Sequence, residues 1–305
     1  MMAEQEYTLF GESLISYKGS VFLSKYLHGG IPGGLAHLDN LKNFQIRDDD
    51  VFIVTFPKSG TTWMQYIIYI LFEDGHPELA DNATWNVMPW LEYAKPDSKH
   101  PRGENSRLYC THLPEHMAPQ GLKDNKGKVI YVMRNPKDVL VSYVHFSNIF
   151  RTFDTVSNLD QILEDFLSGK VHGGSWFDHV KGWFERKDEY NILFVSYEEM
   201  KMDLRSVVRK VSEFVGKSLS DEDIDKVVDR VTFENMKTDS KANYDISAMD
   251  MVFDMSKGKF LRKGTIGDWK NSLTVAQSER FDQVYQERMQ GLPLQFIWDI
   301  KELHG

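Results

Sequence analysis

Short apolar runs recur along the chain, and each of them ends in a turn. Three runs, at residues 51–56, 129–133 and 192–196, lead directly into stretches with helical spacing, and a fourth short run lies at 107–110. Runs rich in β-branched and aromatic residues and bounded by turn residues are typical of strands. The repeated strand–turn–helix units predict an α/β fold with a central, largely parallel β-sheet flanked by helices.

Apolar residues at three- and four-residue spacing predict helices that pack on this sheet. The clearest such stretches lie at residues 63–72, 139–146, 204–215, 221–231 and 274–289. The first forty residues have weak periodicity, which indicates an irregular strip that covers the core. Residues 77–101 have the composition of a loop that builds a ligand pocket. Residues 238–259 are expected to form either a mobile lid or a plain surface loop.

The bulk composition limits the class of protein. The chain of 305 residues is 41% hydrophobic and contains no internal repeat or linker, so we expect a single domain over residues 1–305. The longest apolar run is about half the length needed to cross a bilayer. A net charge of −9 argues against a general nucleic-acid binder. We therefore expect no membrane partner and no nucleic-acid partner.

Cysteine usage indicates the compartment. The single cysteine, Cys110, excludes an intrachain disulfide, and no charged and then apolar leader begins at Met1. Both observations favour a reducing compartment. The expected location is the cytoplasm.

The first strand leads into a loop suited to an anion. Pro57 ends the strand, and Gly60 lets the backbone approach a ligand closely before a helix begins. Hydroxyl side chains at Ser59, Thr61 and Thr62 flank the free N–H groups of that helix start. Lys58 adds a mobile cation that suits a phosphate or sulfate oxygen. The sequence thus predicts a P-loop-like strand–loop–helix, although Lys58 precedes the glycine and the spacing is not that of the Walker nucleotide loop.

The ends of the other predicted strands also carry polar residues. His112 follows the run at 107–110, Arg134 follows 129–133, and Tyr197 follows 192–196. The carboxyl ends of parallel strands are where α/β folds bind their ligands. In a Walker-type nucleotide-binding protein the strand at residues 129–133 would be followed by an acidic metal ligand, but it is followed by Arg134. His112 and His116 cannot bind a metal ion from one face of a helix, because Pro114 breaks the helix that their spacing would need. We therefore expect a site without metal.

The stretch at residues 55–63 closely resembles the 5′-phosphosulfate loop of the cytosolic sulfotransferases, which use 3′-phosphoadenosine 5′-phosphosulfate (PAPS). The resemblance covers nearly the whole chain and includes residues 110–114, 131–139 with Ser142, Tyr197, 232–233 and 260–269. Residues 48–50 and 296–300 look most similar to the subfamily that includes the amine sulfotransferases.

The resemblance implies roles for individual residues. Trp63 and Phe233 would clamp the adenine, Tyr197 would contact the base, and His112 matches the catalytic base of the family. The residues implied to hold the 5′-phosphosulfate are Lys58, Ser59, Gly60, Thr61, Thr62 and Trp63. Those implied to hold the 3′-phosphate are Arg134 and Ser142, over which residues of the stretch Phe260, Leu261, Arg262, Lys263 and Gly264 close. The resemblance also places Thr232 among the residues that bind the nucleotide. The chain departs from the pattern at Cys110, where many relatives have a lysine near the acceptor, and at residues 231–233, where it has Val-Thr-Phe and relatives often have Thr-Ser-Phe.

The chemistry expected of these residues is sulfuryl transfer from PAPS to a hydroxyl or an amine. His112 can take the proton of the attacking group near neutral pH, and Lys58 can stabilise the charge on the departing phosphate. The acceptor would be a small hydrophobic phenol, steroid or arylamine, consistent with xenobiotic or steroid metabolism. The residues expected to line its pocket are Phe22, Trp85, Trp90, Cys110, Phe146 and Phe150.

Several alternatives remain open. The acceptor group is either a hydroxyl or an amine, so both O-sulfation and N-sulfation fit the sequence. A metal-dependent nucleotide kinase would require the Walker loop and a carboxylate metal ligand. A non-catalytic nucleotide-binding module would keep the anion loop but tolerate the loss of His112.

A short motif near the C-terminus predicts assembly. Residues 270–279 match the dimer motif of the family, Lys-x-x-x-Thr-Val-x-x-x-Glu, at Lys270, Thr274, Val275 and Glu279. Thr274 is also a good N-cap for the helix that follows. A patch of this size would bury less than the roughly 1,200 Å² of a standard interface. We expect a weak homodimer, with Val275 against its mate and Lys270 paired with Glu279 across the two-fold axis.

Overall fold

A parallel sheet of four strands forms the centre of the fold, in the order β5-β4-β6-β7. The computed structural model describes residues 5–9, 12–25, 27, 34–73, 83–94, 100, 105–151, 153, 158–243 and 252–303. The strands are β4 (Val51–Thr55), β5 (Leu108–Thr111), β6 (Lys128–Met133) and β7 (Ile192–Ser196), and every pairing among them is parallel. Because β5 and β6 lie on opposite sides of β4, the strand order reverses at β4 and opens a crevice at its carboxyl end. The predicted parallel sheet is confirmed.

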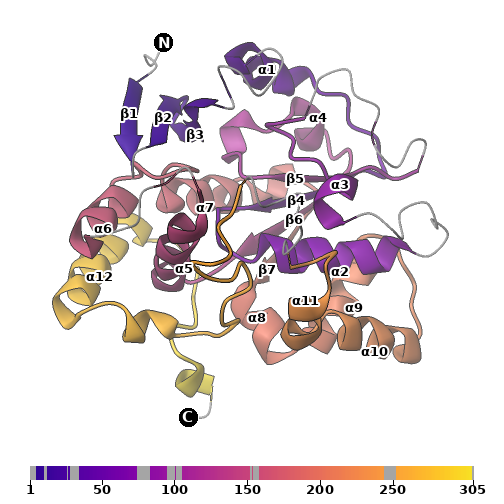
Figure 1. The fold of residues 1–305 in the computed structure, drawn as a ribbon. Coiled ribbons are helices and arrows are strands. Elements are labelled where there is room, and N and C mark those ends of the chain that lie inside the picture. The colour runs from indigo at the N-terminus through magenta and orange to yellow at the C-terminus, as the bar shows by residue number, and fades with distance from the viewer. Residues whose placement is uncertain are drawn as a thin grey trace.

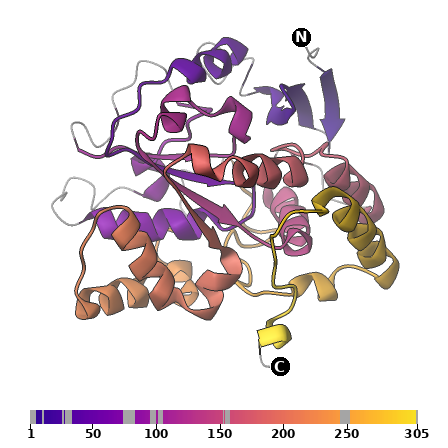
Figure 2. The ribbon, with the colours of Figure 1, turned by 180° about the vertical axis from the view of Figure 1, so that it is seen from behind.

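Successive strand residues alternate between two hydrophobic clusters, one on each face of the sheet. In β4, Val51 and Ile53 join one cluster, and Phe52 and Val54 join the other. The first of these clusters is completed by α2 and α8 to α11, the second by α1, α5 to α7 and α12. Figure 1 shows the two groups of helices on different sides of the sheet, and the view from behind in Figure 2 shows the same separation. This alternation is what a parallel sheet buried on both faces requires.

The helices cover most of the stretches with helical spacing. Their bounds are α1 (Gly34–Asn40), α2 (Thr61–Glu73), α3 (Thr84–Val87), α4 (Gln120–Lys123), α5 (Pro136–Ile149), α6 (Leu159–Leu167), α7 (Trp176–Glu185), α8 (Tyr197–Met202), α9 (Leu204–Phe214), α10 (Asp221–Arg230), α11 (Phe233–Thr238) and α12 (Val275–Met289). Helix α5 is longer than the predicted stretch at 139–146 because it begins at Pro136, where the side chain of Asn135 accepts a hydrogen bond from the N–H of Asp138. None of the helices within the described residues has the length and apolar character needed to cross a membrane.

The N-terminal segment is a second sheet, so the prediction of an irregular strip was wrong. Strands β1 (Gln5–Leu9), β2 (Glu12–Tyr17) and β3 (Ser20–Leu23) pair antiparallel in chain order. The two-residue turn between β2 and β3 has positive φ at Lys18 and Gly19, which is the geometry that matches the twist of a tight hairpin. All four residues of β3 are buried, so no alternation of polar and apolar residues marks this strand in the sequence.

The two predicted loops lie partly outside the described residues. Of residues 77–101, the structure describes 83–94 and 100, which include the single turn of α3. Of residues 238–259, it describes 238–243 and 252–259, so the choice between a lid and a surface loop at 244–251 lies outside the described part of the chain.

Candidate functional site

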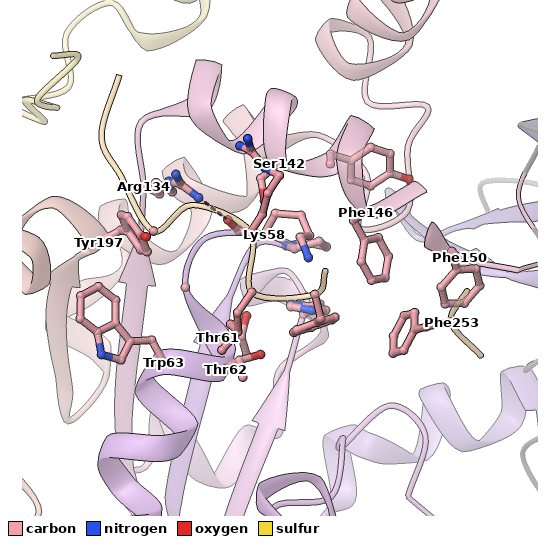
Figure 3. A pocket seen from close by; sticks show the side chains of 18 of the residues that line it. Lys58, Thr61, Thr62, Trp63, Arg134, Ser142, Phe146, Phe150, Tyr197 and Phe253 are labelled. Atoms are coloured by element: carbon pink, nitrogen blue, oxygen red, sulfur yellow. Dashed lines mark hydrogen bonds between the residues drawn. The ribbon is translucent and has the colours of Figure 1, made fainter. Parts of the chain in front are cut away.

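All four strands of the central sheet lead to one cavity of about 510 Å³. Lys58 follows β4, His112 follows β5, Arg134 follows β6 and Tyr197 follows β7, and all four residues line the cavity. Figure 3 shows Lys58 in the middle, with one group of side chains on each side of it. We call one side the cationic end; it is lined by Trp63, Arg134, Ser142, Tyr197, Phe233, Arg262, Lys263 and Gly264. We call the other side the phenylalanine end; it is lined by Phe146, Phe150 and Phe253.

The loop after β4 presents backbone N–H groups to the cavity. The first hydrogen bond of α2 runs from the N–H of Met64 to the carbonyl of Gly60, so the N–H groups of Thr61, Thr62 and Trp63 precede it. Gly60 has a φ of 110°, and a Cβ atom there would lie 3.0 Å from the Tyr197 ring. A glycine is therefore required for the backbone to turn this closely under the cavity. The helix start is suited to an anion.

Ser59 was predicted to line this anion site, but its side chain does not reach the cavity. Its side chain is fully buried, and its N–H donates to the carbonyl of Phe56 at 3.2 Å inside the loop. The residues before and after it, Lys58 and Gly60, do line the cavity. The positive φ values of these two neighbours turn the chain so that Ser59 points inward.

Lys58 carries its ammonium group between two aromatic rings. Its Nζ atom lies 4.0 Å from the centre of the Phe146 ring and 4.8 Å from that of Phe260. Burial, together with the positive charges of Arg134 and Arg262, lowers the pKa of Lys58 from its ordinary value to about 7. An anion at the helix start would favour the protonated form, because an opposite charge stabilises the ammonium group.

Arg134 is held by the backbone of two loops and is not fully satisfied. Its guanidinium donates to the carbonyls of Lys58 at 3.4 Å and Thr265 at 3.1 Å, and it stacks 4.1 Å from the centre of the Tyr197 ring. Its Nε atom is buried without a hydrogen-bond partner. A buried donor without a partner is costly, so this atom marks a place that an anionic oxygen would fill. Ser142, from α5, lines the same end of the cavity.

Aromatic side chains frame the cationic end. Trp63 donates its indole N–H to the carbonyl of Val231 at 2.8 Å, and its ring meets Tyr197 edge-on at 5.4 Å. Phe233 begins α11 and packs so tightly against Gly264 that a Cβ atom there would lie 2.5 Å from the Phe233 ring. Aromatic rings from α2, α8 and α11 thus line this end, and aromatic faces suit stacking with a flat group such as a nucleobase. Trp63, Tyr197 and Phe233 were predicted to contact the same adenine, and all three line this end of the cavity.

Arg262 and Lys263 reach the cavity while paired with one buried carboxylate. The Asp268 side chain lies 2.6 Å from Arg262 and 2.7 Å from Lys263. Burial raises the pKa of Asp268, but hydrogen bonds from Lys263, Asn271 and Arg262 outweigh it and hold that pKa well below its usual range. The carboxylate therefore stays charged and orients both cations.

Thr232 caps a helix and does not reach the cavity. Its hydroxyl accepts a hydrogen bond from the N–H of Asn235 at the start of α11 and donates to the carbonyl of Asp229. Phe233, the next residue, lines the cavity, as do Phe260 and Leu261. The predicted contribution of Thr232 is thus indirect, because it fixes the turn that presents Phe233.

His112 is oriented by the backbone of β4. Its Nδ1 atom lies 2.7 Å from the carbonyl oxygen of Thr55. A carbonyl oxygen can only accept, so Nδ1 carries the proton and Nε2 keeps its lone pair. The backbone N–H of His112 donates to the carboxylate of Glu92 at 2.8 Å, and the ring packs 4.5 Å from that of Trp90.

The environment of His112 keeps the imidazole neutral. Burial lowers the pKa of His112 well below its ordinary value; the bond to Thr55 opposes this, and the charges of neighbouring His172, His179 and Lys58 add to it. A neutral imidazole with a free Nε2 lone pair is the form that accepts a proton. His112 therefore lines the cavity as a neutral imidazole in the tautomer that can accept a proton at Nε2.

The phenylalanine end is built from side chains that lie far apart in the sequence. Phe146 and Phe150 come from the end of α5, and Phe253 comes from the segment after residue 251, with ring centres 5.4 to 5.7 Å apart. Trp85 and Trp90 line the same cavity, as predicted. Further lining residues that the sequence did not single out for the pocket are Leu23, Tyr93, Tyr143, Phe153, His172, Val252 and Phe253.

Two of the residues predicted to line the acceptor pocket, Phe22 and Cys110, do not line the cavity. Phe22 is 3% exposed and packs in a hydrophobic cluster without lining the cavity. Its neighbour Leu23 belongs to the same cluster but also lines the cavity, because successive side chains of a strand point to opposite faces. Cys110 is fully buried in the cluster that packs against α2. Its thiol therefore does not replace a cation in the cavity. Burial raises the pKa of this thiol far above its ordinary value.

The other predicted features lie elsewhere on the surface. Val275 begins α12 and is 75% exposed, and Thr274 caps this helix by accepting a hydrogen bond from the N–H of Gln277. Lys270 is already paired within the chain with Asp299, so a pairing with Glu279 of a second copy would compete with that contact. Among the described residues, no group of three or more His, Cys, Asp or Glu side chains is placed to hold a metal ion.

Comparisons with known proteins show the family of this chain. The family model described as "Sulfotransferase domain" matches residues 48–293. The amine sulfotransferase of Oryctolagus cuniculus is 48% identical over 267 residues, which are 87% of this chain and 89% of the relative. Sulfotransferase 2B1 of Rattus norvegicus is 44% identical over 269 residues, covering 88% of this chain and 78% of the relative. The crystal structure of mouse sulfotransferase SULT7A1 complexed with PAP has a TM-score of 0.75 at 31% identity and covers 92% of this chain and 96% of that one. The chain therefore belongs to the sulfotransferase family, as its motifs predicted.

Proposed function

We propose that this protein transfers the sulfuryl group of PAPS to a hydroxyl or an amine of a small hydrophobic acceptor. His112 acts as the general base, and Lys58 stabilises the departing phosphate. The observation that carries the proposal is the 2.7 Å contact between His112 Nδ1 and the Thr55 carbonyl, which leaves Nε2 as a proton acceptor in the same cavity as Lys58.

The cationic end fits the nucleotide of PAPS. Unpaired N–H groups at the start of α2 suit the 5′-phosphosulfate, and the partnerless Nε atom of Arg134, with Ser142 beside it, suits the 3′-phosphate. The aromatic rings of Trp63, Tyr197 and Phe233 suit the adenine. Support also comes from the solved relative that was crystallised with PAP, which is 31% identical to this chain.

The residues of the chain act in a simple order. PAPS supplies an activated sulfuryl group when bound. His112 Nε2 takes the proton of the acceptor as the new O–S or N–S bond forms, and the S–O bond to the phosphate breaks. Lys58 and the helix-start N–H groups bind the phosphate oxygens, whose negative charge increases in this step. No metal ion is required in this scheme, because the charge is stabilised by Lys58 and backbone dipoles.

The phenylalanine end provides an apolar site for the acceptor. Its rings and the indoles of Trp85 and Trp90 bury apolar surface on any flat or compact acceptor. Phenols, steroids and arylamines all meet this requirement, so O-sulfation and N-sulfation both stay within the proposal. The similarity to an amine sulfotransferase favours testing amines first. We also propose that the enzyme works in the cytoplasm as a weak homodimer.

The test of the reaction is His112→Ala. Removing the base should lower kcat by about 100- to 10,000-fold, the range typical of general-base catalysis. The affinity for PAP, measured by calorimetry, should stay within about threefold of the original, because the phosphate contacts are intact. Turnover within a few-fold of the original protein would contradict the role of His112 and would assign the proton transfer to another group.

The acceptor is identified by a screen with sulfur-labelled PAPS. Matched phenols, arylamines and hydroxysteroids should be compared by kcat/KM, and transfer to none of them would contradict the proposed acceptor class. Activity should persist in a chelator, whereas a metal-dependent transferase would lose it.

A further inference from the structure

A short segment after α12 packs next to the chain segments that form the cationic end, and the proposed reaction gives it no role. We call residues 296–299 the C-terminal strap; none of these four residues lines the cavity. The Phe296 ring lies 5.4 Å from that of Trp176 in α7, and the Trp298 ring meets Tyr285 of α12 edge-on at 5.0 Å. These contacts fix the strap to the hydrophobic cluster on one face of the sheet.

The backbone of the strap is bonded to two separate parts of the chain. The side-chain amide of Asn135, in the turn between β6 and α5, donates to the carbonyl of Ile297 at 3.2 Å. The indole N–H of Trp269, in the loop before α12, donates to the carbonyl of Trp298 at 2.8 Å. The strap therefore joins the turn after β6 to the loop that carries the cationic doublet.

Each of these attachments lies next to a cation of the site. Asn135 directly follows Arg134. Trp269 directly follows Asp268, whose carboxylate is paired with both cations at residues 262–263. A shift of Trp269 would therefore move Asp268, and with it the two cations that this carboxylate orients.

The loop and the strap also fit closely together. Gly267 has a φ of 81°, and a Cβ atom there would lie 3.3 Å from the Cα atom of Asp299 and 3.3 Å from the carbonyl oxygen of Trp298. The ammonium group of Lys137 lies 4.3 Å from the centre of the Trp269 ring and 5.6 Å from that of Trp298, so one cation contacts an indole from each segment. Since the loop and the strap share backbone, hydrogen-bond and cation–π contacts, we expect them to move together.

We propose that the C-terminal strap holds the cations of the nucleotide site in place, with Trp269 as the positioning residue between them. A loop that is already attached to the strap loses less conformational freedom when a ligand binds, so its affinity for the nucleotide is higher. By linkage, a nucleotide that binds the cations stabilises the attached strap to the same extent. The inference rests on the proposed function, because it takes the nucleotide of PAPS as the ligand of the cationic end.

The first test is Trp269→Phe, which keeps an aromatic ring beside Lys137 and removes the indole N–H donor. The Kd for PAP, measured by calorimetry, should rise by about three- to tenfold, the effect of one lost hydrogen bond. The KM for PAPS should rise by a similar factor. The KM for the acceptor should not change, because the phenylalanine end keeps all of its contacts.

A matched control for this variant is Trp183→Phe. The indole N–H of the buried Trp183 donates to the carbonyl of Leu113 at 3.2 Å, so the control loses the same kind of hydrogen bond at a place that does not contact the strap. It should lower the melting temperature, as Trp269→Phe does, but leave the affinity for PAP unchanged. The pair of variants thus separates positioning of the cations from a general loss of stability.

The second test measures the linkage by hydrogen exchange in the original protein. A saturating concentration of PAP should slow amide exchange at residues 296–303, which lie outside the cavity. The slowing should be smaller in Trp269→Phe, and in Trp183→Phe it should be as large as in the original protein.

Three results would overturn the inference. One is a folded Trp269→Phe variant that binds PAP as tightly as the original protein, and another is an equal loss of PAP affinity in Trp269→Phe and Trp183→Phe. The third is an exchange rate at residues 296–303 that saturating PAP does not alter; this measurement needs no variant, so it decides the question if Trp269→Phe does not fold. Failure of the proposed function is distinguishable, because the original protein would then not bind PAP or would not transfer the sulfuryl group.

Discussion

The two ends of the cavity are built in different ways. The cationic end comes from strand ends and helix starts, and close backbone contacts fix it, such as that of Gly264 with the ring of Phe233. The phenylalanine end comes from the end of α5 and the segment after residue 251. Backbone hydrogen bonds from Arg151 to Val252 and from Asp254 to Ile149 join these two segments, and the rings of Phe146, Phe150 and Phe253 pack against one another. The two ends therefore differ in what faces the cavity, which is a helix start with cations at the first and aromatic rings at the second. We expect the first end to bind the donor and the second to select the acceptor.

Among the variants that test this difference, Arg134→Ala is expected to have the largest effect, which is on the affinity for the nucleotide. We expect only a nucleotide with a 3′-phosphate to meet this cation, so affinity for 3′,5′-bisphosphate should fall by about 10- to 100-fold, corresponding to a charged hydrogen bond of about 1.5–3 kcal/mol. Affinity for adenosine 5′-phosphate should fall by less than about threefold. Calorimetric titration of both nucleotides measures the difference.

A matched control for this variant is Arg280→Ala, which removes an exposed arginine paired with Glu164 on the surface. It should change neither affinity. Equal losses for the two nucleotides in Arg134→Ala would show that Arg134 only supports the loops at Lys58 and Thr265.

A second effect, of up to about tenfold per pH unit, is expected from Lys58. Its pKa is about 7 in the nucleotide-free protein, and a bound phosphate raises it. Below this pKa the ammonium group is already present, and above it binding must take up a proton. The Kd for PAP should therefore rise as the pH increases from 7 to 9. Lys58→Arg keeps its charge throughout this range and should abolish that rise; a pH-dependent Kd in Lys58→Arg would assign it to another group.

Val275→Glu is expected to have the smallest effect on binding and catalysis at the two ends of the cavity. Val275 is 75% exposed at the start of α12, outside the cavity. In the proposed homodimer it would meet its mate, and two carboxylates at that contact would repel. Sedimentation should show a monomer with unchanged kcat/KM per chain. An unchanged dimer would remove this motif from the interface, and a loss of activity would show that assembly supports the site.

The cationic end could be predicted from the sequence more fully than the phenylalanine end. His112, Arg134 and Tyr197 were predicted as a group because each directly follows an apolar strand, and parallel strands end at the same edge of a sheet. The cationic doublet at Arg262 and Lys263 came only from the family resemblance, since a basic pair by itself is usually solvated.

The phenylalanine end could not be derived in this way. Strand β3 is buried along its whole length, so the sequence does not distinguish Phe22, in the core, from Leu23, in the cavity. Cys110 was misplaced because the face to which a strand residue points depends on the register, which a four-residue strand does not specify. His172 had no signal at all, because it lies in a loop, and only the tertiary contacts of Gly173 bring it beside His112.

The carboxylate of Asp268 has a consequence for the timing of turnover. It pairs with both Arg262 and Lys263 in the nucleotide-free protein. A phosphate that binds these cations shares them with a resident anion, so part of the attraction it gains is offset by the attraction Asp268 loses. If the nucleotide binds at these two cations, we expect Asp268 to act as an internal competitor that favours departure of the spent nucleotide, and nucleotide exchange to be faster than the number of positive charges at the site would suggest.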